Sequence, residues 1–342
     1  MMIETAHHAV SDGQWDEYIE RHPDATLYHA SAWKRIARDS YGIEDVSLTA
    51  LDNGRIVGIL PLFKARQISG GSYVTSGIFG AYNGVLSERD DVRSILNERA
   101  VSMCAGDARC FLVIKDTTHY PAPGFAVSQE YVTFTLALNR ISDQVWAKIK
   151  DKTRNQVRKA EKSGCVVIRD NTGIDEFARV YARNMRDMGT PFLGWKFLHC
   201  VLKHFGAKAN VFCIRRGVKT IAGGIMLRFK ECAYMPFASS LRRYNEYCPN
   251  NLLYWEAIKF ACAQGCEQFD FGRSTVNTGT YNFKKQWGAQ PRQLYYRYYP
   301  AVAGTRTFNP NDKKYSMMIN CWRLIPVRLA SCVGPAIVRH FV

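Results

Sequence analysis

The sequence predicts an α/β (α+β) protein in which mixed sheets are flanked by helices and one kind of α/β unit occurs twice. Helical and strand-like hydrophobic patterns interchange along the chain. Its 342 residues suffice for about two domains. Two hairpin patterns, at residues 45–63 and 210–229, resemble one another. Each has a turn glycine, a glycine inside the returning strand and then an apolar run, which indicates an internal duplication.

The elements of the first half follow from apolar residues at helical spacing and from alternating residues about the turn Asn53-Gly54. These patterns predict helices at 14–21, 31–40 and 91–103, and strands at 45–51, 55–63, 111–115 and 131–137. The segment 77–84 contains three glycines and two aromatic residues. It is either a loop that lets a ligand approach the backbone closely or a plain connection between strands.

One long helix, 142–163, is predicted between the two halves, and its later part is densely basic. Arg154 and Arg158 are four residues apart and share a face, with Lys159 beside them. Like charges at this spacing destabilise a helix slightly unless an anion or a carboxylate answers them. The face is therefore either a phosphate-contacting surface or a solvated basic surface.

The second half repeats this kind of pattern. It predicts strands at 166–169, 210–214, 220–229 and 233–238, and helices at 174–188 and 195–204. A tyrosine-rich strand near 295–299 and a basic tail at 315–342 come last. The tail is expected to form two short amphipathic helices, which either pack back on the fold or contact anionic lipid.

The stretch 250–288 carries the clearest functional signal. Its patterns predict, in order, a helix, a short strand, a glycine-containing loop and a basic-aromatic segment, at 251–264, 268–271, 272–279 and 281–288. The free N–H groups that begin the helix, at Asn250, favour an anion. Arg273, Lys284 and Lys285 are nearby in sequence, so the stretch could hold a phosphorylated or otherwise anionic acyl carrier. The alternative is a buried helix and strand with a solvated basic loop.

Composition is that of an ordinary soluble globular protein, with 47% hydrophobic and 22% charged residues. The formal net charge of +16 favours anionic partners such as phosphorylated ligands, RNA or an anionic membrane surface. No feature points to DNA.

The eleven cysteines form no CxxC pair and no Cys/His ligand set, so reduced thiols are expected and no metal site is predicted. The N-terminus lacks the pattern of a signal peptide, and no apolar run reaches about 18 residues. We therefore expect a cytoplasmic protein that could touch the inner membrane face.

Several motifs together resemble one known family. They are Tyr28-His29-Ala30-Ser31-Ala32-Trp33, Tyr82-Asn83-Gly84, Met188-Gly189-Thr190-Pro191, Asp270-Phe271-Gly272-Arg273-Ser274 and Phe283-Lys284-Lys285-Gln286-Trp287-Gly288. They are similar to the FemAB group of GNAT-like acyltransferases, most of all to the branch associated with exosortase/PEP-CTERM and exopolysaccharide systems. The resemblance implies tandem GNAT-like (acyl-CoA N-acyltransferase fold) domains at 1–145 and 146–300, followed by a basic tail at 301–342.

The resemblance also implies the transfer of an acyl or aminoacyl group to an amine in cell-envelope or exopolysaccharide biosynthesis. The donor is expected to be acyl-CoA or aminoacyl-tRNA, with no tightly bound cofactor. The expected acceptor is a sugar nucleotide, a lipid-linked sugar or a peptidoglycan precursor. The usual GNAT pyrophosphate loop is not evident in this sequence. No Ser/His/Asp or Cys/His signature indicates a covalent intermediate, so we expect direct transfer.

Carried onto this sequence, the motifs suggest roles for particular side chains. The family places the lysine of the Phe-Lys motif, here Lys284, at the transfer site, where it would stabilise the oxyanion or a carrier phosphate. Asp270 and Tyr281 are candidates to take a proton. The candidate substrate-binding residues are Tyr82, Asn83, Arg154, Arg158, Lys159, Asn250, Tyr254, Trp255, Arg273, Phe283 and Lys285.

Two other functions remain open at this point. The protein could be a catalytically silent GNAT-like scaffold for polysaccharide assembly, or an RNA-binding protein attracted by its positive charge.

Overall fold

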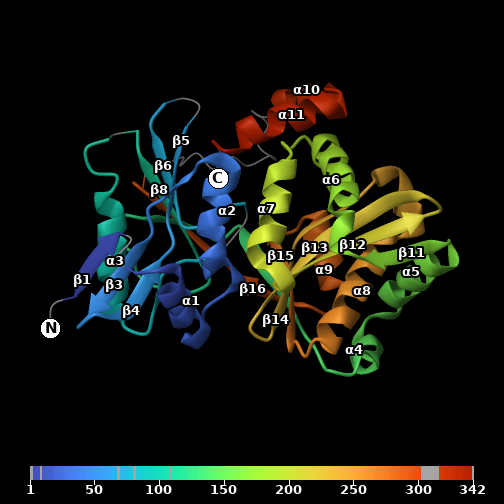
Figure 1. Cartoon of the computed structure of the whole chain (residues 1–342), viewed down its shortest axis with the longest axis horizontal. Coiled ribbons are helices and arrows are strands. Elements are labelled where there is room, and N and C mark those ends of the chain that lie inside the picture. The colour runs from blue at the N-terminus through green and yellow to red at the C-terminus, as the bar shows by residue number, and fades with distance from the viewer. Residues whose placement is uncertain are drawn as a thin grey trace. The chain divides into compact units, whose positions relative to one another are not determined.

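The computed structural model describes residues 3–7, 10–67, 70–79, 82–107, 109–301 and 316–340. The chain divides into two compact units, coloured along the chain in Figure 1. The first comprises Met1–Tyr131, Gln293–Thr307 and Arg339–Val342, and the second comprises Val132–Arg292 and Phe308–Val338.

The first unit contains two sheets and three α-helices among its described residues. Its four-stranded sheet has the order β1-β3-β4-β7, and its six-stranded sheet has the order β2-β5-β6-β8-β17-β9. The helices are α1 (Asp12–Arg21), α2 (Ala32–Tyr41) and α3 (Asp90–Ser102). The strands are β1 (Glu4–His7), β2 (Glu44–Asp45), β3 (Leu48–Asp52), β4 (Arg55–Leu60), β5 (Phe63–Arg66), β6 (Ser72–Thr75), β7 (Leu86–Ser87), β8 (Phe111–Asp116), β9 (Ala126–Ser128) and β17 (Tyr295–Tyr299).

The second unit is built on one seven-stranded sheet, β11-β12-β13-β14-β15-β10-β16. The strands are β10 (Tyr131–Ala137), β11 (Cys165–Arg169), β12 (Ala209–Arg216), β13 (Lys219–Phe229), β14 (Cys232–Ser240), β15 (Gln268–Thr275) and β16 (Gln290–Gln293). The helices are α4 (Ser142–Lys148), α5 (Asp151–Lys162), α6 (Ile174–Met188), α7 (Trp195–Phe205), α8 (Pro249–Ala263), α9 (Gly279–Lys285), α10 (Ser316–Leu324) and α11 (Val327–Val338).

Both units share one chain path. In the first, β5 pairs antiparallel with β6, α3 follows, and β8 returns parallel to β6. In the second, β13 pairs antiparallel with β14, α8 follows, and β15 returns parallel to β14. Parallel pairing requires such a crossover, and here a helix supplies it. The predicted fold of two tandem α/β units with mixed sheets and flanking helices is confirmed.

The strand beside each parallel pair comes from a distant part of the sequence. β17 lies next to β8, and β10 lies next to β15. As a result, β10 joins the sheet of the second unit although it precedes residue 145, and β17 joins the first although it precedes residue 300. The predicted limits 1–145 and 146–300 simply follow chain order. They therefore assign β10 to the first unit and β17 to the second, whereas each strand belongs to the sheet of the other unit.

The similar glycines of the two hairpins lie where a helix packs closely on a strand. A Cβ at Gly58 would come within 2.6 Å of Val92 on α3, and one at Gly223 within 3.0 Å of Phe177 on α6. Both hairpins also carry a bulge, at Ala50/Leu51 and at Ile214/Arg215. The repeated glycine pattern therefore has one physical cause, a close approach of helix to sheet.

Several predicted boundaries are wrong, and two of the differences affect the second unit. The helix predicted at 142–163 is two helices, α4 and α5, because Ile149 and Lys150 are extended at their junction. The break lets Val145, Ile149 and Val157 all enter one core. The predicted loop 272–279 and the segment after it are also more regular than expected. β15 runs on to Thr275, and α9 begins at Gly279 after the side-chain cap of Thr278.

The described part of the tail packs on the second unit. Helices α10 and α11 contact α6. Ile319 lies against Gly189, and Gly334 lies against the backbone of Phe192. This confirms the two short helices and their packing on the fold, whereas residues 302–315 of the predicted tail lie outside the described residues.

Three further expectations concern absences. The cysteines are all free thiols. Within the described ranges, no cluster of three or more His, Cys, Asp or Glu side chains could hold a metal ion. No described helix combines the length and hydropathy needed to cross a bilayer.

Candidate functional site

The two adjacent lysines of the basic-aromatic segment have opposite environments. They end α9, a helix whose first turn is capped by the Thr278 hydroxyl, which accepts a hydrogen bond from the backbone N–H of Tyr281. Successive helix residues point about 100° apart, so only one lysine can face inward. Lys284 is buried, 6% exposed, while Lys285 is exposed.

The Lys284 ammonium lies among backbone carbonyls of β15. Its Nζ donates hydrogen bonds to the carbonyl oxygens of Gly272, at 2.7 Å, and of Arg273, at 2.9 Å. Burial lowers the pKa of Lys284 from 10.5 to about 7, which the Asp270 carboxylate opposes and Arg273 reinforces. Near neutral pH this amine is therefore close to its midpoint, as a group that holds or moves a proton requires.

The Asp270 carboxylate is buried beside this lysine. Its Oδ1 accepts hydrogen bonds from the Thr133 hydroxyl of β10, at 2.8 Å, and from the Gly272 backbone N–H, at 2.6 Å. Gly272 has φ +76°, a left-handed conformation that suits glycine, and its N–H donates to the carboxylate two residues earlier in the chain. Asp270 thus fixes the turn of the backbone whose carbonyls hold Lys284.

The site lies where two parallel strands stop pairing. β14 pairs with β15 over three residue pairs, from Cys232↔Gln268 to Tyr234↔Asp270. Both strands continue beyond that point, to Ser240 and Thr275. Gly272 comes two residues after the last pair, so Lys284 donates to strand carbonyls just beyond the end of the ladder. Backbone groups at such an ending need partners other than a neighbouring strand.

An aromatic cluster supports the helix that carries Lys284. The ring of Tyr254, on α8, stacks on Phe271 with centroids 5.3 Å apart and contacts Phe283 at 5.3 Å. Trp287 contacts both Phe271 and Phe283. Tyr254 is buried, and burial raises the pKa of its hydroxyl. The predicted substrate-binding residues Tyr254 and Phe283 therefore lie within the packing behind α9.

Tyr281 and Arg273 lie at the edges of this cluster. Tyr281 is half-buried, and its ring packs edge-on against Phe134 at 4.9 Å. Arg273 is exposed, although its backbone carbonyl binds Lys284. The structure thus brings Tyr281, Arg273, Asp270 and Lys284 into one segment of the second unit.

The N-terminus of α8 adjoins the basic helix α5. The Asn251 side chain donates a hydrogen bond to Gln156 of α5 at 3.1 Å, whereas Asn250 is half-buried. Thr153, at the start of α5, donates to the Gln286 carbonyl at 3.1 Å, just after α9. The start of α8, the start of α5 and the end of α9 are therefore neighbours, as a carrier site at the start of α8 would require.

The two arginines of α5 already have protein partners. Arg154 is ion-paired with Asp151. The Arg158 guanidinium lies over the Trp146 ring at 5.7 Å, and Trp146 in turn packs on Trp255 at 4.4 Å. Arg158 and Lys159 are exposed. Trp255 is buried, so it supports this surface from below.

The two predicted acceptor-contacting residues lie in the first unit and are buried. The Tyr82 ring packs edge-on against Tyr28 at 4.7 Å, and the Asn83 amide donates to the Tyr28 carbonyl at 2.9 Å. Gly80 and Ala81, of the same glycine-containing segment, lie outside the described residues. In this conformation the loop packs against the Tyr28 motif, and its contact with an acceptor stays a prediction.

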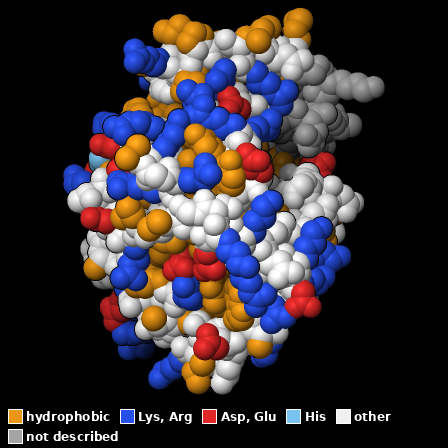
Figure 2. All heavy atoms as spheres, turned by 90° about the vertical axis from the view of Figure 1, so that its right-hand side faces the viewer, with side chains coloured by type: hydrophobic (Ala, Val, Ile, Leu, Met, Phe, Trp, Pro, Cys, Tyr) orange, Lys and Arg blue, Asp and Glu red, His pale blue; other side chains and the backbone are white. Residues whose placement is uncertain are grey.

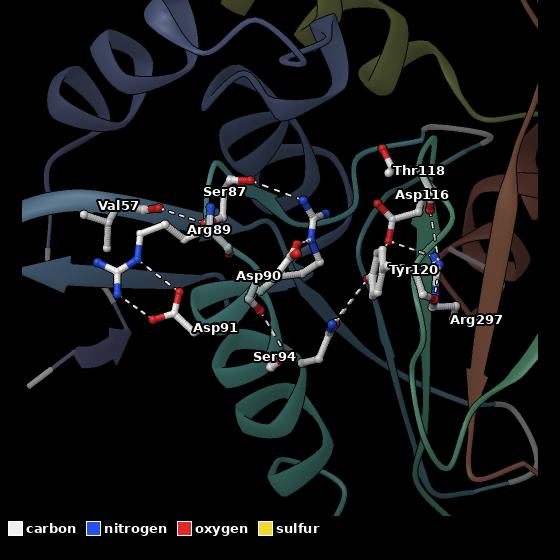
Figure 3. Close-up of polar contacts among 12 residues, drawn as sticks. Val57, Ser87, Arg89, Asp90, Asp91, Ser94, Asp116, Thr118, Tyr120 and Arg297 are labelled. Atoms are coloured by element: carbon white, nitrogen blue, oxygen red, sulfur yellow. Dashed lines mark hydrogen bonds and ion pairs between the residues drawn. The ribbon is translucent and has the colours of Figure 1, made fainter.

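A second buried polar cluster, in the first unit, was not predicted (Figure 3). The guanidinium of Arg297, on β17, pairs with the Asp116 carboxylate at 3.0 Å. The Tyr120 hydroxyl also donates to Asp116, at 2.7 Å. Burial raises the pKa of Asp116 to about 6, against the opposing effects of Arg297 and the Tyr120 hydrogen bond. The Gly84 backbone lies against this carboxylate, beside a cavity of about 10 Å³, roughly one water molecule.

Sequence reasoning missed Thr133, Asp116 and Arg297. Each is a buried polar residue in a strand that is otherwise largely hydrophobic or aromatic, which is the signal that could have identified it. Their partners could not be read from the sequence, because each lies more than a hundred residues away along the chain.

Comparison with known proteins agrees with this architecture. Residues 147–285 match the family described as an acetyltransferase (GNAT) domain. That segment contains α5, α8, β14, β15 and Lys284. No curated protein matches the chain in sequence.

Solved structures resemble the chain in fold at low sequence identity. FemX matches with a TM-score of 0.65 and 13% identity, covering 92% of this chain and 100% of FemX. A tandem GNAT protein from the clavulanic acid biosynthesis pathway matches with a TM-score of 0.56 and 10% identity, covering 89% and 100%. L-PGS from Bacillus licheniformis matches with a TM-score of 0.53 and 11% identity, covering 85% and 96%.

The expected enzyme class, an acyltransferase, is confirmed at the level of this domain. The resemblance to FemAB-type proteins is confirmed in the fold shared with FemX, and the tandem arrangement in that shared with the clavulanic acid pathway protein. Residues 147–285 therefore match a GNAT acetyltransferase domain, and the chain as a whole has a tandem GNAT-like fold that resembles FemX and the tandem GNAT protein of the clavulanic acid pathway.

Proposed function

We propose that the protein transfers an acyl or aminoacyl group from acyl-CoA or aminoacyl-tRNA directly to an amine. The observation that carries this proposal is the buried Lys284 amine, held by two backbone carbonyls beside Asp270 within the matched domain. A cation at such a place can stabilise the oxyanion that forms when an amine attacks a carbonyl carbon.

The reaction needs few groups from the protein. The acceptor nitrogen bonds to the acyl carbon, the carbon–sulfur or carbon–oxygen bond to the carrier breaks, and the proton of the amine ends on the released thiol or hydroxyl. Tyr281, which is half-buried, is our candidate to relay that proton. Asp270 is better suited to hold Lys284, because its carboxylate already accepts from Thr133 and Gly272.

The Cys232 thiol, on which the charge of this carboxylate acts, supports direct transfer over a covalent intermediate. Burial, with the Asp270 charge next in size, raises the pKa of the Cys232 thiol well above its usual value. A thiol in that state holds its proton and is a poor nucleophile at neutral pH.

The motifs that resemble the FemAB branch support an acceptor from cell-envelope or exopolysaccharide biosynthesis. We propose a sugar nucleotide, a lipid-linked sugar or a peptidoglycan precursor, used on the cytoplasmic side of the inner membrane. The basic face of Arg154, Arg158 and Lys159 is proposed to hold phosphates of the donor or acceptor, because the helix that carries it contacts the start of α8 through Gln156. The net charge of +16 agrees with an anionic carrier.

One observation favours a second candidate function, that of a silent scaffold. Both hydrogen bonds of the Lys284 amine go to backbone carbonyls, so the side chain ties α9 to β15 whether or not a substrate binds. In that case Lys284→Ala would alter stability and leave the biological role intact.

Labelled acyl-CoA and charged tRNA, each offered separately with envelope precursors, would test the proposal. We expect transfer from one donor, with kcat reduced by about 10²–10³-fold in Lys284→Met. Lys285→Met is the matched control, because the neighbouring lysine is exposed, and it should retain activity. Thermal unfolding of both variants separates loss of chemistry from loss of fold. Consumption of neither donor would favour the scaffold, whereas equal rates in the two variants would exclude Lys284 from the transfer step.

A further inference from the structure

Helices α10 and α11 are apolar on two opposite faces. The inner face is buried and includes Ile319 on α10, with Ala330, Gly334 and Val338 on α11. The outer face exposes large hydrophobic side chains, at Met317, Met318, Leu324, Leu329 and Val333. Leu324 is 83% exposed and Leu329 is 57% exposed. A pair of helices that served only to cover α6 would have a polar outer face.

The exposed residues follow helical spacing. Met317, Cys321 and Leu324 are four and three residues apart, so they share one side of α10. On α11, exposed Leu329, Cys332, Val333 and Ala336 share one side in the same way. We call these seven residues, together with Met318, the outer apolar face. It extends over both short helices. Hydrophobic residues that were scattered singly over the surface would not follow helical spacing in this way.

The charge of this surface has one sign. Between residues 316 and 338 there is no Asp or Glu, and the exposed charges are Arg323 and Arg328, on either side of the junction between the helices. α10 contacts the end of α6, where Ile319 lies against Gly189. The carboxylate just before that contact, Asp187, is ion-paired with Arg186. Figure 2 shows hydrophobic side chains along the upper edge of the molecule, over these helices, with a broad group of Lys and Arg side chains below them.

We propose that the outer apolar face is a membrane-binding surface that lies on an anionic lipid bilayer. Hydrophobic side chains at the level of the acyl chains, with arginines at the level of the headgroups, form the arrangement by which interfacial helices bind. The helices, of 9 and 12 residues, are too short to span a bilayer. A second copy of the chain fits this face less well, because a symmetric contact would oppose Arg323 and Arg328 with their own equivalents.

This inference is independent of the proposed transferase activity. It concerns a surface of α10 and α11 that includes none of the residues around Lys284. Either proposal can therefore fail without affecting the other.

Binding to vesicles tests the surface directly. The full chain should co-sediment with vesicles that contain about one-quarter phosphatidylglycerol in phosphatidylcholine, and bind those of phosphatidylcholine alone at least about tenfold more weakly. Leu324→Glu with Leu329→Glu should weaken binding to the anionic vesicles by at least about tenfold. The matched control is Val166→Glu with Val218→Glu, which adds the same charge at two exposed apolar residues elsewhere in the second unit. Equal binding by both double variants, or no binding by the wild type, would overturn the proposal.

The exposed cysteines offer a second measurement that needs no change to the fold. Of the eleven thiols, Cys321 and Cys332 are the exposed ones, and both belong to the outer apolar face. An environment-sensitive maleimide attached there should shift its emission to the blue when anionic vesicles are added. Vesicle binding without that shift would mean a purely electrostatic contact elsewhere. Self-association that Leu324→Glu abolishes would assign the face to a second copy. Either result contradicts the proposal.

Discussion

The amino group of Lys284 donates a hydrogen bond to the carbonyl oxygen of Gly272 at 2.7 Å, across twelve positions of sequence. This contact joins α9 to β15 at the point where β15 stops pairing with β14. The hydrogen bonds of this buried amine go to neutral carbonyl oxygens. Burial therefore lowers its pKa to about 7. The same contact therefore has a consequence for stability and another for chemistry.

The first prediction concerns stability and pH. Between about pH 7 and 10.5 the unfolded chain holds a proton on Lys284 that the folded chain has released, so the free energy of unfolding should rise with pH. Lys284→Met removes this contribution. The difference in unfolding free energy, wild type minus variant, should then increase by about 1.4 kcal/mol per pH unit above neutrality. Urea unfolding at successive pH values measures this difference. A constant difference would mean that the amine keeps an ordinary pKa.

The second prediction follows from the proposed activity. The Asp270 charge favours the protonated form of Lys284, so Asp270→Asn should lower the pKa of that lysine further. If the ammonium is the active form, the alkaline fall of kcat/KM should move to lower pH in this variant. Asparagine can still accept from Thr133 and Gly272, which preserves the turn. Glu267→Gln, an exposed position nearby in sequence, removes the same charge and should leave the profile unchanged.

The third prediction concerns the buried ion pair of the first unit. Arg297→Met leaves the Asp116 carboxylate buried without its cation and should destabilise the protein by about 3–5 kcal/mol. Replacing both partners, as Asp116→Val with Arg297→Met, should recover part of this loss. We expect a coupling of about 1–3 kcal/mol in a double-mutant cycle followed by urea unfolding. Additive single losses would show that the pairing contributes nothing beyond each side chain alone.

The fourth prediction concerns the glycine beneath α6. A Cβ at Gly223 would lie 2.8 Å from the Phe212 carbonyl oxygen and 3.0 Å from the Phe177 ring, so Gly223→Ala should lower stability by about 1–3 kcal/mol. Gly13→Ala is the control. Its Cβ would meet no atom closer than 3.8 Å, and alanine in this helix should stabilise by up to about 1 kcal/mol. Thermal unfolding compares the two, and equal effects would contradict the close approach.

Local sequence patterns predicted the elements well where each element has its own periodicity and its own end signal. Helix α6 has the predicted bounds, Ile174–Met188, because its apolar face is regular and Gly189 ends it in a left-handed conformation. The two hairpins were recognised by their turn glycines. The break between α4 and α5 was missed, since nothing local marks Ile149 as a residue that must turn inward.

The sequence by itself determined that the chain is a duplicated α/β protein and that the basic, aromatic segment at 281–288 is the candidate site. Both follow from periodicity, turn residues and motifs, which are local properties. Only the tertiary structure decided that Lys284 rather than Lys285 faces inward, and that Thr133 meets Asp270 while Arg297 meets Asp116. Those outcomes depend on helix rotation and on which distant strands lie side by side. No short window of sequence contains the register of a sheet assembled from strands more than a hundred residues apart.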